Sequence, residues 1–331
     1  MISIIIPCYN SRKYIVKTLD SLRNQTCKNF KAIFIDDGSS DGTTEVIKEK
    51  LEDSDVNYEV FLIQHQGVGA ARNYGIKASS TPYIMFLDSD DYLTDNCIEL
   101  FVHEIKRNSP EVIIGEYEHE LKNNIIWRYT DNYEAFEGNL KSYEVLNKIL
   151  DNKIHIWTSN AIYKSSLFKD ISFDLKCMFH EDLNVWYRLI NKSEQIYFMK
   201  KIVSVYVIRD NSISHDLNIE KLEQGIYMLE DLYEKFQEEN LSQNILNKIK
   251  NKTMPNLLFL FFNYLCFDNI DIISIYKEKH YLKVMKKAKL ENMSIHAFIK
   301  YLRIKLIGHF PSLYICVWKL YKNKIKVLLR R

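Results

Sequence analysis

Two aspartates separated by one residue, Asp88 and Asp90, follow a short apolar run that ends at Leu87. A continuous apolar run predicts a strand buried on both faces, so both carboxylates are expected at its carboxyl end. Two such carboxylates can share one divalent cation, or one can bind the cation while the other accepts a hydroxyl group. The alternative is an ordinary polar turn, because Asp and Ser are common turn residues.

A second acidic pair, Asp36 and Asp37, follows another apolar run that ends at Ile35. Parallel strands end along one edge of a sheet, so we expect this pair to lie near the first two aspartates in a cleft with several carboxylates. An aspartate there can accept a hydrogen bond from the imide N–H of uracil or from ribose. A calcium loop is excluded, because Lys48 stands where an EF-hand loop has its glutamate.

Two glycine- or proline-containing segments are candidates for binding a nucleotide. Pro7 and Tyr9 lie at the end of the first apolar run. The Tyr9 ring can stack on a nucleobase, and the backbone around Pro7 can form hydrogen bonds to that base. The alternative is that Tyr9 is a core tyrosine at a strand end. Gly67 and Gly69 predict a turn before a helix, whose free N–H groups suit a phosphate, and Arg72 adds a cation. Neither a Walker loop nor GxGxxG is present there.

Further candidates lie in the middle of the chain. Glu181 and Asp182 begin a predicted helix, where a carboxylate acts either as a simple cap or as a general base for an incoming hydroxyl. After the last predicted strand, Arg209 can neutralise a diphosphate and His215 can be a third metal ligand. The alternative for His215 is a solvated loop histidine.

The elements that must position these residues alternate between strand and helix patterns over the first hundred residues. This alternation predicts a Rossmann-like, mostly parallel sheet flanked by helices. Strands are expected at 3–7, 30–35, 58–63, 83–87, 111–117, 125–129 and 196–207. Only helical patterns follow from residue 218. We therefore expect an α/β domain over 1–217, with halves of about 1–110 and 111–217, and a helical region over 218–331.

Charge is unevenly distributed along the 331 residues, although the net charge is only +2. No acidic residue follows Glu291, and the tail after it carries nine lysines and arginines. A basic tail with interleaved apolar residues predicts contact with an anionic membrane surface; a solvated basic face on packed helices is the alternative. No nucleic-acid-binding motif is present.

Composition and cysteine spacing restrict the class of protein. The 47% hydrophobic and 27% charged residues are typical of a soluble globular chain and exclude a disordered or fibrous one. Six cysteines without CxxC spacing indicate neither a zinc site nor a disulfide framework. With no signal peptide or transmembrane pattern, we expect a cytoplasmic protein, peripheral on the inner face of the cell membrane if its tail binds there.

Four segments taken in order resemble the nucleotide-sugar domain of family 2 glycosyltransferases, which have the GT-A fold. These segments are SIIIPCYN, FIDDGSSDGT, HQGVGAARNYGI and YIMFLDSDD. The resemblance is close over 2–91 and looser as far as His215. It implies that Pro7 and Tyr9 line the base pocket, with Asp37, and also Asp36, at the uracil edge. Arg72 would lie near the nucleotide.

The resemblance also assigns the reacting end of the site. It implies that Asp88 lies near the ribose and that Asp90 ligates a Mn²⁺ or Mg²⁺ ion bridging the diphosphate. In the family's E-D motif, Asp182 would be the catalytic base and Glu181 would bind substrate, while Trp157 would lie on the acceptor side. One base and a separate metal-binding pair suit direct displacement with inversion.

These inferences define an inverting, metal-dependent hexosyltransferase. Its donor would be a UDP-sugar, and its acceptor a hydroxyl of a saccharide or lipid-linked saccharide in the synthesis of a cell-surface polysaccharide such as a capsule. A nucleotidyltransferase, or a non-catalytic nucleotide-sugar-binding partner of another transferase, are the alternatives. The nucleotidyltransferase alternative has less support, because no glycine-rich triphosphate loop follows the first predicted strand.

Overall fold

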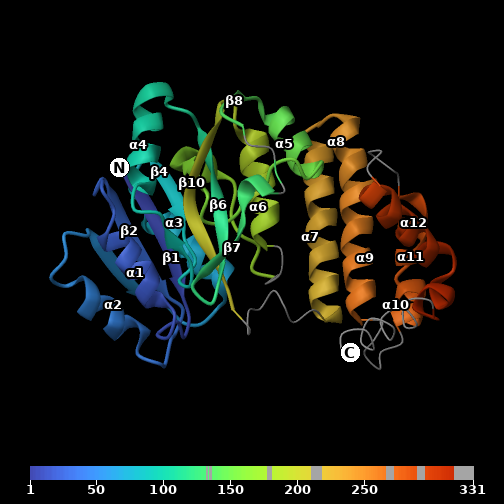
Figure 1. The fold of residues 1–331 in the computed structure, drawn as a ribbon, viewed down its shortest axis with the longest axis horizontal. Coiled ribbons are helices and arrows are strands. Elements are labelled where there is room, and N and C mark those ends of the chain that lie inside the picture. The colour runs from blue at the N-terminus through green and yellow to red at the C-terminus, as the bar shows by residue number, and fades with distance from the viewer. Residues whose placement is uncertain are drawn as a thin grey trace. The chain divides into compact units, whose positions relative to one another are not determined.

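The computed structural model describes residues 1–131, 133, 136–176, 181–209, 218–265, 272–288 and 295–316. The chain divides into two compact units, residues 1–212 and 213–331, and each is treated by itself (Figure 1). The domain boundary predicted at Leu217 lies outside the described residues.

A ten-stranded sheet forms the first unit, with β1 (Ile2–Cys8) at the centre of its parallel half. The strand order is β3-β2-β1-β4-β9-β6-β10-β5, with β7 paired to β6 and β8 to β10. β1 is parallel to β2 (Phe30–Asp36) and to β4 (Tyr83–Phe86), and β2 is parallel to β3 (Tyr58–Leu62). β1 and β4 are buried along their whole length, as their continuous apolar runs predict.

The second half of the unit adds strands of mixed direction. They are β5 (Tyr92–Leu93), β6 (Val112–Leu121), β7 (Asn124–Arg128), β8 (Gly138–Leu140), β9 (Ala161–Lys164) and β10 (Ile196–Ile208). β9 is antiparallel to both β4 and β6, and β6 is parallel to β10. β1, β2, β4, β6 and β10 therefore all end at the same edge of the sheet.

Helices cover both faces of this sheet. They are α1 (Ile15–Arg23), α2 (Thr43–Leu51), α3 (Val68–Ala78), α4 (Cys97–Asn108), α5 (Ser142–Leu150) and α6 (Glu181–Lys192). The main core joins the even-numbered side chains of β1 to α1, α2 and α4, while Ile33 and Ile35 of β2 pack against Ala71 of α3. A Cβ on Gly75 would clash with the side chain of Ile5, so glycine there lets α3 pack directly on β1.

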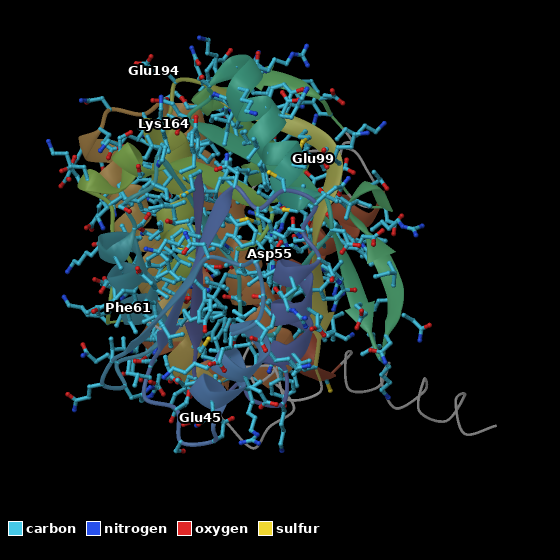
Figure 2. The ribbon with its side chains drawn as sticks, turned by 90° about the vertical axis from the view of Figure 1, so that its left-hand side faces the viewer. Glu45, Asp55, Phe61, Glu99, Lys164 and Glu194 are labelled. Carbon is cyan, nitrogen blue, oxygen red and sulfur yellow. The ribbon has the colours of Figure 1, made fainter. Side chains whose placement is uncertain are left out.

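Charged side chains lie on the outside of this unit. In the side view of Figure 2, Glu45, Glu99 and Glu194 lie at its periphery, and Asp55 faces the viewer. All four residues are exposed. The carboxylates at the carboxyl edge of the sheet differ from these, because most of them are buried or ion-paired.

Helices are the only regular elements among the described residues of the second unit. They are α7 (Ile219–Glu238), α8 (Gln243–Lys248), a π-helical turn (Ile249–Thr253), α9 (Met254–Leu265), α10 (Ile272–Glu278), α11 (Tyr281–Lys287) and α12 (Ile295–His309). The side chain of Asn218 caps α7 by accepting the N–H of Lys221 at 2.9 Å. Within the described part of the chain, no helix combines the length and apolar character needed to cross a bilayer.

Candidate active site

Tyr9 follows β1 at the carboxyl edge of the sheet, and its ring stacks on the imidazole of His65. The ring centroids lie 4.1 Å apart with an interplanar angle of 18°, and Tyr9 is 49% exposed. Asp37 fixes the segment that carries His65. Its carboxylate accepts the N–H groups of Gln66 and Gly67 at 2.8 Å and lies 2.9 Å from the His65 Nδ1 atom. The sequence analysis assigned no role to His65, although this residue begins the segment HQGVGAARNYGI.

The remaining residues predicted for the base pocket are buried. Pro7 lies within β1 opposite Ile35 of β2. Asp36 accepts hydrogen bonds from the N–H of Ser39 and the hydroxyl of Thr44. Asp36 is thus bound within its own loop, whereas Asp37 is bound to the loop after β3.

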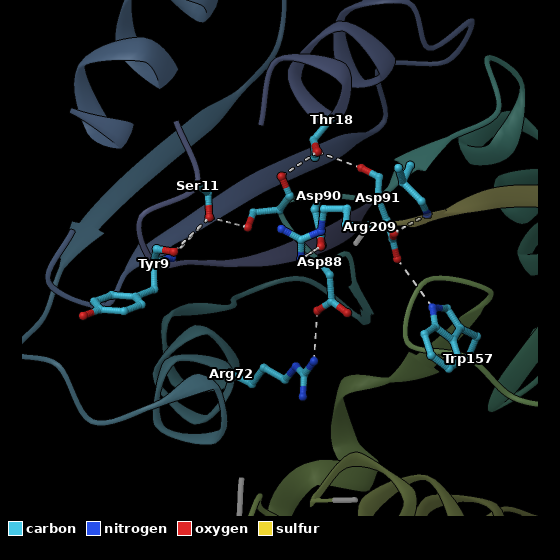
Figure 3. A network of polar contacts seen from close by, with 11 residues as sticks. Tyr9, Ser11, Thr18, Arg72, Asp88, Asp90, Asp91, Trp157 and Arg209 are labelled. Atoms are coloured by element: carbon cyan, nitrogen blue, oxygen red, sulfur yellow. Dashed lines mark hydrogen bonds and ion pairs between the residues drawn. The ribbon is translucent and has the colours of Figure 1, made fainter. Parts of the chain in front are cut away.

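The loop after β4 carries Asp88 and Asp90, and each carboxylate is paired with an arginine. Nη2 of Arg72 donates to Oδ1 of Asp88 at 2.9 Å, and Arg209 forms an ion pair with Asp90 (Figure 3). The guanidinium of Arg209 also lies 4.4 Å above the ring of Tyr14. The structure therefore brings Arg209, which follows β10, to the same loop as the two predicted aspartates.

Polar contacts with the segment before and within α1 hold this loop in place. The hydroxyl groups of Ser11 and Ser89 lie 2.7 Å apart. The Thr18 hydroxyl lies 3.0 Å from the Ser89 carbonyl and 2.7 Å from the Asp91 carbonyl (Figure 3). Since all four residues are buried, the loop is anchored before any ligand binds.

Arg72 is the buried link between the loop after β4 and the start of α6. Its side chain is only 4% exposed, and its Nη1 atom donates to Oε1 of Glu181 at 2.8 Å. Its guanidinium also lies 5.3 Å from the ring centroid of Phe173. The two carboxylates raise the pKa of Arg72 above its usual value, although burial opposes them. Arg72 therefore stays charged between Asp88 and Glu181.

Glu181 and Asp182 occupy different environments although they are adjacent. The Glu181 side chain is 9% exposed, and burial together with the neighbouring charge of Asp182 raises its pKa to about 7, while Arg72 opposes that rise. Asp182 is only partly buried. Of the two carboxylates that the sequence analysis singled out here, Glu181 is held by Arg72, and Asp182 is the more accessible.

Asp88 and Asp90, the carboxylates after β4, are the side chains that could hold a divalent cation. Burial and the charge of Asp88 raise the pKa of Asp90 to about 6, although Arg209 opposes the rise, so a second positive charge would be stabilised there. Two hard oxygen ligands leave coordination positions open for phosphate oxygens, as Mg²⁺ and Mn²⁺ sites commonly do. Among the described residues, no group of three His, Cys, Asp or Glu side chains is arranged for a metal. His215 lies outside the described residues.

Trp157 belongs to a group of rings, here called the aromatic cluster. It comprises Tyr117, His119, Trp127, Tyr129, Tyr133, His155, Trp157 and Tyr206. The Trp157 ring lies 4.7 Å from that of Tyr206, and its Nε1 atom donates to Oδ2 of the buried Asp91 at 3.4 Å. Trp127, Tyr133, Trp157 and Tyr206 are partly exposed.

The aromatic cluster also adjoins the start of α6. Burial lowers the pKa of His155 to about 4, and the charge of Asp182 opposes this effect. The same charge contributes to the raised pKa of the buried Tyr187. Asp182 therefore lies within electrostatic range of the rings, and the site combines an accessible carboxylate, an aromatic surface and a loop that suits a cation.

Solved structures show which fold this architecture represents. The chain is similar to Staphylococcus aureus TarS 1–349, solved in complex with UDP-GlcNAc, with a TM-score of 0.71 and 17% identity. The match covers 98% of this chain and 92% of that one. The fold is thus GT-A-like: a mixed α/β sheet flanked by helices, followed by a helical region, as the sequence analysis predicted.

The family assignment follows from sequence. Residues 3–172, about half of the chain, match the model of glycosyl transferase family 2, and the chain belongs to this family. A processive diacylglycerol beta-glycosyltransferase of Mycoplasma genitalium is 29% identical over 255 residues, covering 74% of this chain and 73% of that protein. The minor teichoic acid biosynthesis protein GgaB of Bacillus subtilis is 27% identical over 219 residues, which is 64% of this chain and 23% of that protein. The predicted family is confirmed.

Proposed function

We propose that this glycosyltransferase moves a hexosyl residue from a UDP-sugar to a hydroxyl of a saccharide or lipid-linked saccharide, with inversion and with the help of a divalent cation. The observation that carries the proposal is the link made by Arg72, which holds Asp88 at one end and the start of α6 at the other. This link between the loop after β4 and the start of α6 supports a single site that contains both Asp88 and Asp182. The TarS complex with UDP-GlcNAc and the role of GgaB in teichoic acid synthesis support a UDP-sugar and a cell-surface glycan.

The donor would bind along the carboxyl edge of the sheet. The exposed Tyr9 ring, backed by His65, offers a flat surface for the uracil base. Asp88, whose side chain is 27% exposed, is available to a ribose hydroxyl on its free oxygen. Asp37 acts through the backbone of residues 65–67, which it fixes behind the base.

The cation would be held by Asp90, with Asp88 beside it. When bound, Mn²⁺ or Mg²⁺ stabilises the negative charge that develops on the leaving diphosphate. Arg209 supplies positive charge at the same place, because it already pairs with Asp90. The two acidic side chains and this arginine thus match the charge that bond cleavage produces.

Asp182 would take the proton from the acceptor hydroxyl as the new bond forms. The acceptor would lie against the partly exposed rings of the aromatic cluster, since sugar C–H groups pack well on aromatic faces. A single base beside the acceptor suits one direct displacement, which inverts the anomeric centre. Glu181, paired with Arg72, would orient the donor loop rather than touch substrate.

Contact with an anionic membrane would bring a lipid-linked acceptor to the site from the cytoplasmic side. The tail residues 317–331 lie outside the described residues, but α12 shows the same combination of side chains. Its Ile299 and Leu302 are each 48% exposed, and Lys300 lies between them. The diacylglycerol glycosyltransferase of Mycoplasma genitalium supports this proposal by its acceptor. The fraction of protein that sediments with vesicles containing anionic lipid should be lower for the I299S/L302S variant than for the wild type. Equal fractions would contradict membrane binding through α12.

Calorimetric titration with UDP tests the donor and metal assignments. The wild-type chain should bind UDP more tightly with Mn²⁺ than with EDTA. Asp90→Ala should lose this difference, whereas Asp53→Ala, which removes an exposed carboxylate elsewhere, should retain it. UDP affinity that does not respond to the cation in the wild type would contradict the metal assignment.

A further inference from the structure

A pocket of about 460 Å³ opens at the carboxyl edge of the sheet, next to the candidate active site. Its walls come from the start of α1, the turn between β6 and β7, and the end of β10. Six charged residues line it: Lys13, Lys17, Lys122, Arg209, Asp90 and Glu120. The pocket is large enough for a small polar ligand, because typical ligand sites measure roughly 300–1,000 Å³.

The charges of this pocket do not balance. Asp90 is paired with Arg209, and Glu120 accepts from Lys17 at 2.6 Å. Lys13 and Lys122 are exposed and have no ion-pair partner among the described residues. The first turn of α1 also contains no acidic residue. Within the described lining residues, two positive charges therefore have no acidic partner, so a ligand with a compact negative charge fits the pocket.

The pocket shares two residues with the proposed cation and diphosphate site but does not reach the residues proposed for the base. Its lining includes Asp90 and Arg209 but none of Pro7, Tyr9 or Arg72. On its other side it is close to the aromatic cluster. One carboxylate oxygen of Asp91 accepts the backbone N–H of Val207, which lines the pocket, at 2.9 Å. The other oxygen accepts the Nε1–H of Trp157. One carboxylate therefore separates the pocket from the acceptor surface.

We propose that this pocket binds a phosphate group carried by the acceptor, such as the phosphate ester of a polyol or saccharide unit. Lys13 and Lys122 would contact the phosphate oxygens, because lysine ammonium groups are common phosphate ligands. This inference rests on the proposed function, since it identifies the chemical class of the acceptor. It predicts that an acceptor unit bearing a phosphate binds better than the same unit without one.

Ligand-observed NMR titration of the full chain with sn-glycerol 3-phosphate tests the proposal, in the presence of saturating UDP and Mn²⁺. Glycerol and inorganic phosphate serve as comparison probes. Lys13→Gln/Lys122→Gln should bind glycerol phosphate about tenfold more weakly, while the charge-preserving Lys13→Arg/Lys122→Arg retains binding. Lys48→Gln/Lys77→Gln removes two exposed charges elsewhere and should leave the affinity unchanged. Thermal unfolding of each variant checks that it is folded.

Several outcomes would overturn the proposal. Equal affinities for the wild type and the K13Q/K122Q variant would remove these lysines from the site. Loss of glycerol phosphate binding when UDP is added would assign the pocket to the donor diphosphate. Inorganic phosphate that binds as tightly as glycerol phosphate would assign it to free phosphate. A chain that binds glycerol phosphate but never binds UDP would contradict the proposed function and leave the phosphate pocket supported.

Discussion

Arg72→Met tests whether a single buried guanidinium holds the two halves of the site together. The substitution removes hydrogen bonds of 2.9 Å to Asp88 and 2.8 Å to Glu181 from a side chain that is 4% exposed. Breaking a buried ion pair by removing one partner costs roughly 3–5 kcal/mol, since a buried charge is left uncompensated. Glu181 can limit the cost by protonation, because its pKa is already raised to about 7. We therefore expect a loss of about 3 kcal/mol at pH 7.5.

Urea unfolding followed by tryptophan fluorescence measures this loss. Three of the four tryptophans, Trp127, Trp157 and Trp186, lie in the first unit, so most of the signal reports on the part of the chain that contains Arg72. Arg128→Met is the matched control. Arg128 makes an ion pair of 2.7 Å with Glu118, but its side chain is 63% exposed, so its removal should cost far less stability than the removal of Arg72.

A double variant separates the charge effect from lost packing. In Arg72→Met/Glu181→Gln, no charge remains at residue 181, so the variant should be more stable than Arg72→Met alone at pH 7.5. Equal losses for Arg72→Met and Arg128→Met would refute the reasoning. A double variant whose loss equals the sum of both single losses would also refute it, because coupled residues should not be additive.

Three further substitutions test other parts of the site. The folded-state pKa of Glu181, about 7, exceeds its unfolded value, so its ionisation lowers the unfolding free energy as pH rises from about 4.5 to 7, by up to about 3 kcal/mol. Glu181→Gln should flatten this pH dependence of the unfolding free energy, measured by urea titration. An unchanged pH dependence would show that Glu181 is not its cause. Trp157→Ala should raise the acceptor KM at least about fivefold with little change in the donor KM, because its ring belongs to the acceptor surface; an effect on the donor KM alone would move Trp157 to the donor side. His65→Ala should weaken UDP binding several-fold by removing the ring behind Tyr9, and an unchanged Kd in calorimetry would exclude this stacking.

Three strands of the parallel half of the sheet, β1, β2 and β4, could be predicted because they are almost completely buried. Their runs are mostly apolar, with Lys31 as the one charged residue before the end of β2, and the acidic residues that follow β2 and β4 lie at one edge, as expected for parallel strands. Strands β5, β8 and β9 were not predicted. They contain two, three and four residues, too few for any periodicity to appear.

The contacts that organise the site could not be predicted from spacing. Arg72 and Glu181 are 109 residues apart, and neither residue type indicates that one will pair with the other. The donors to the acidic pair after β2 could not be predicted either, because Asp36 accepts from Ser39 in its own loop whereas Asp37 accepts from Gln66 and Gly67 in the loop after β3. Trp157 was predicted, but the surrounding rings come from separate segments that only the sheet brings together.

The most direct test of the central claim compares wild type with Asp182→Asn in a transfer assay across a panel of UDP-sugars and phosphate-bearing or neutral acceptors. The account predicts that the wild type transfers sugar and that NMR of the first product shows inversion. Asp182→Asn should bind UDP-sugar with an unchanged Kd and lose transfer by at least about a hundredfold, as expected when a general base is removed. Full transfer by Asp182→Asn, or a product with retained configuration, would contradict the account.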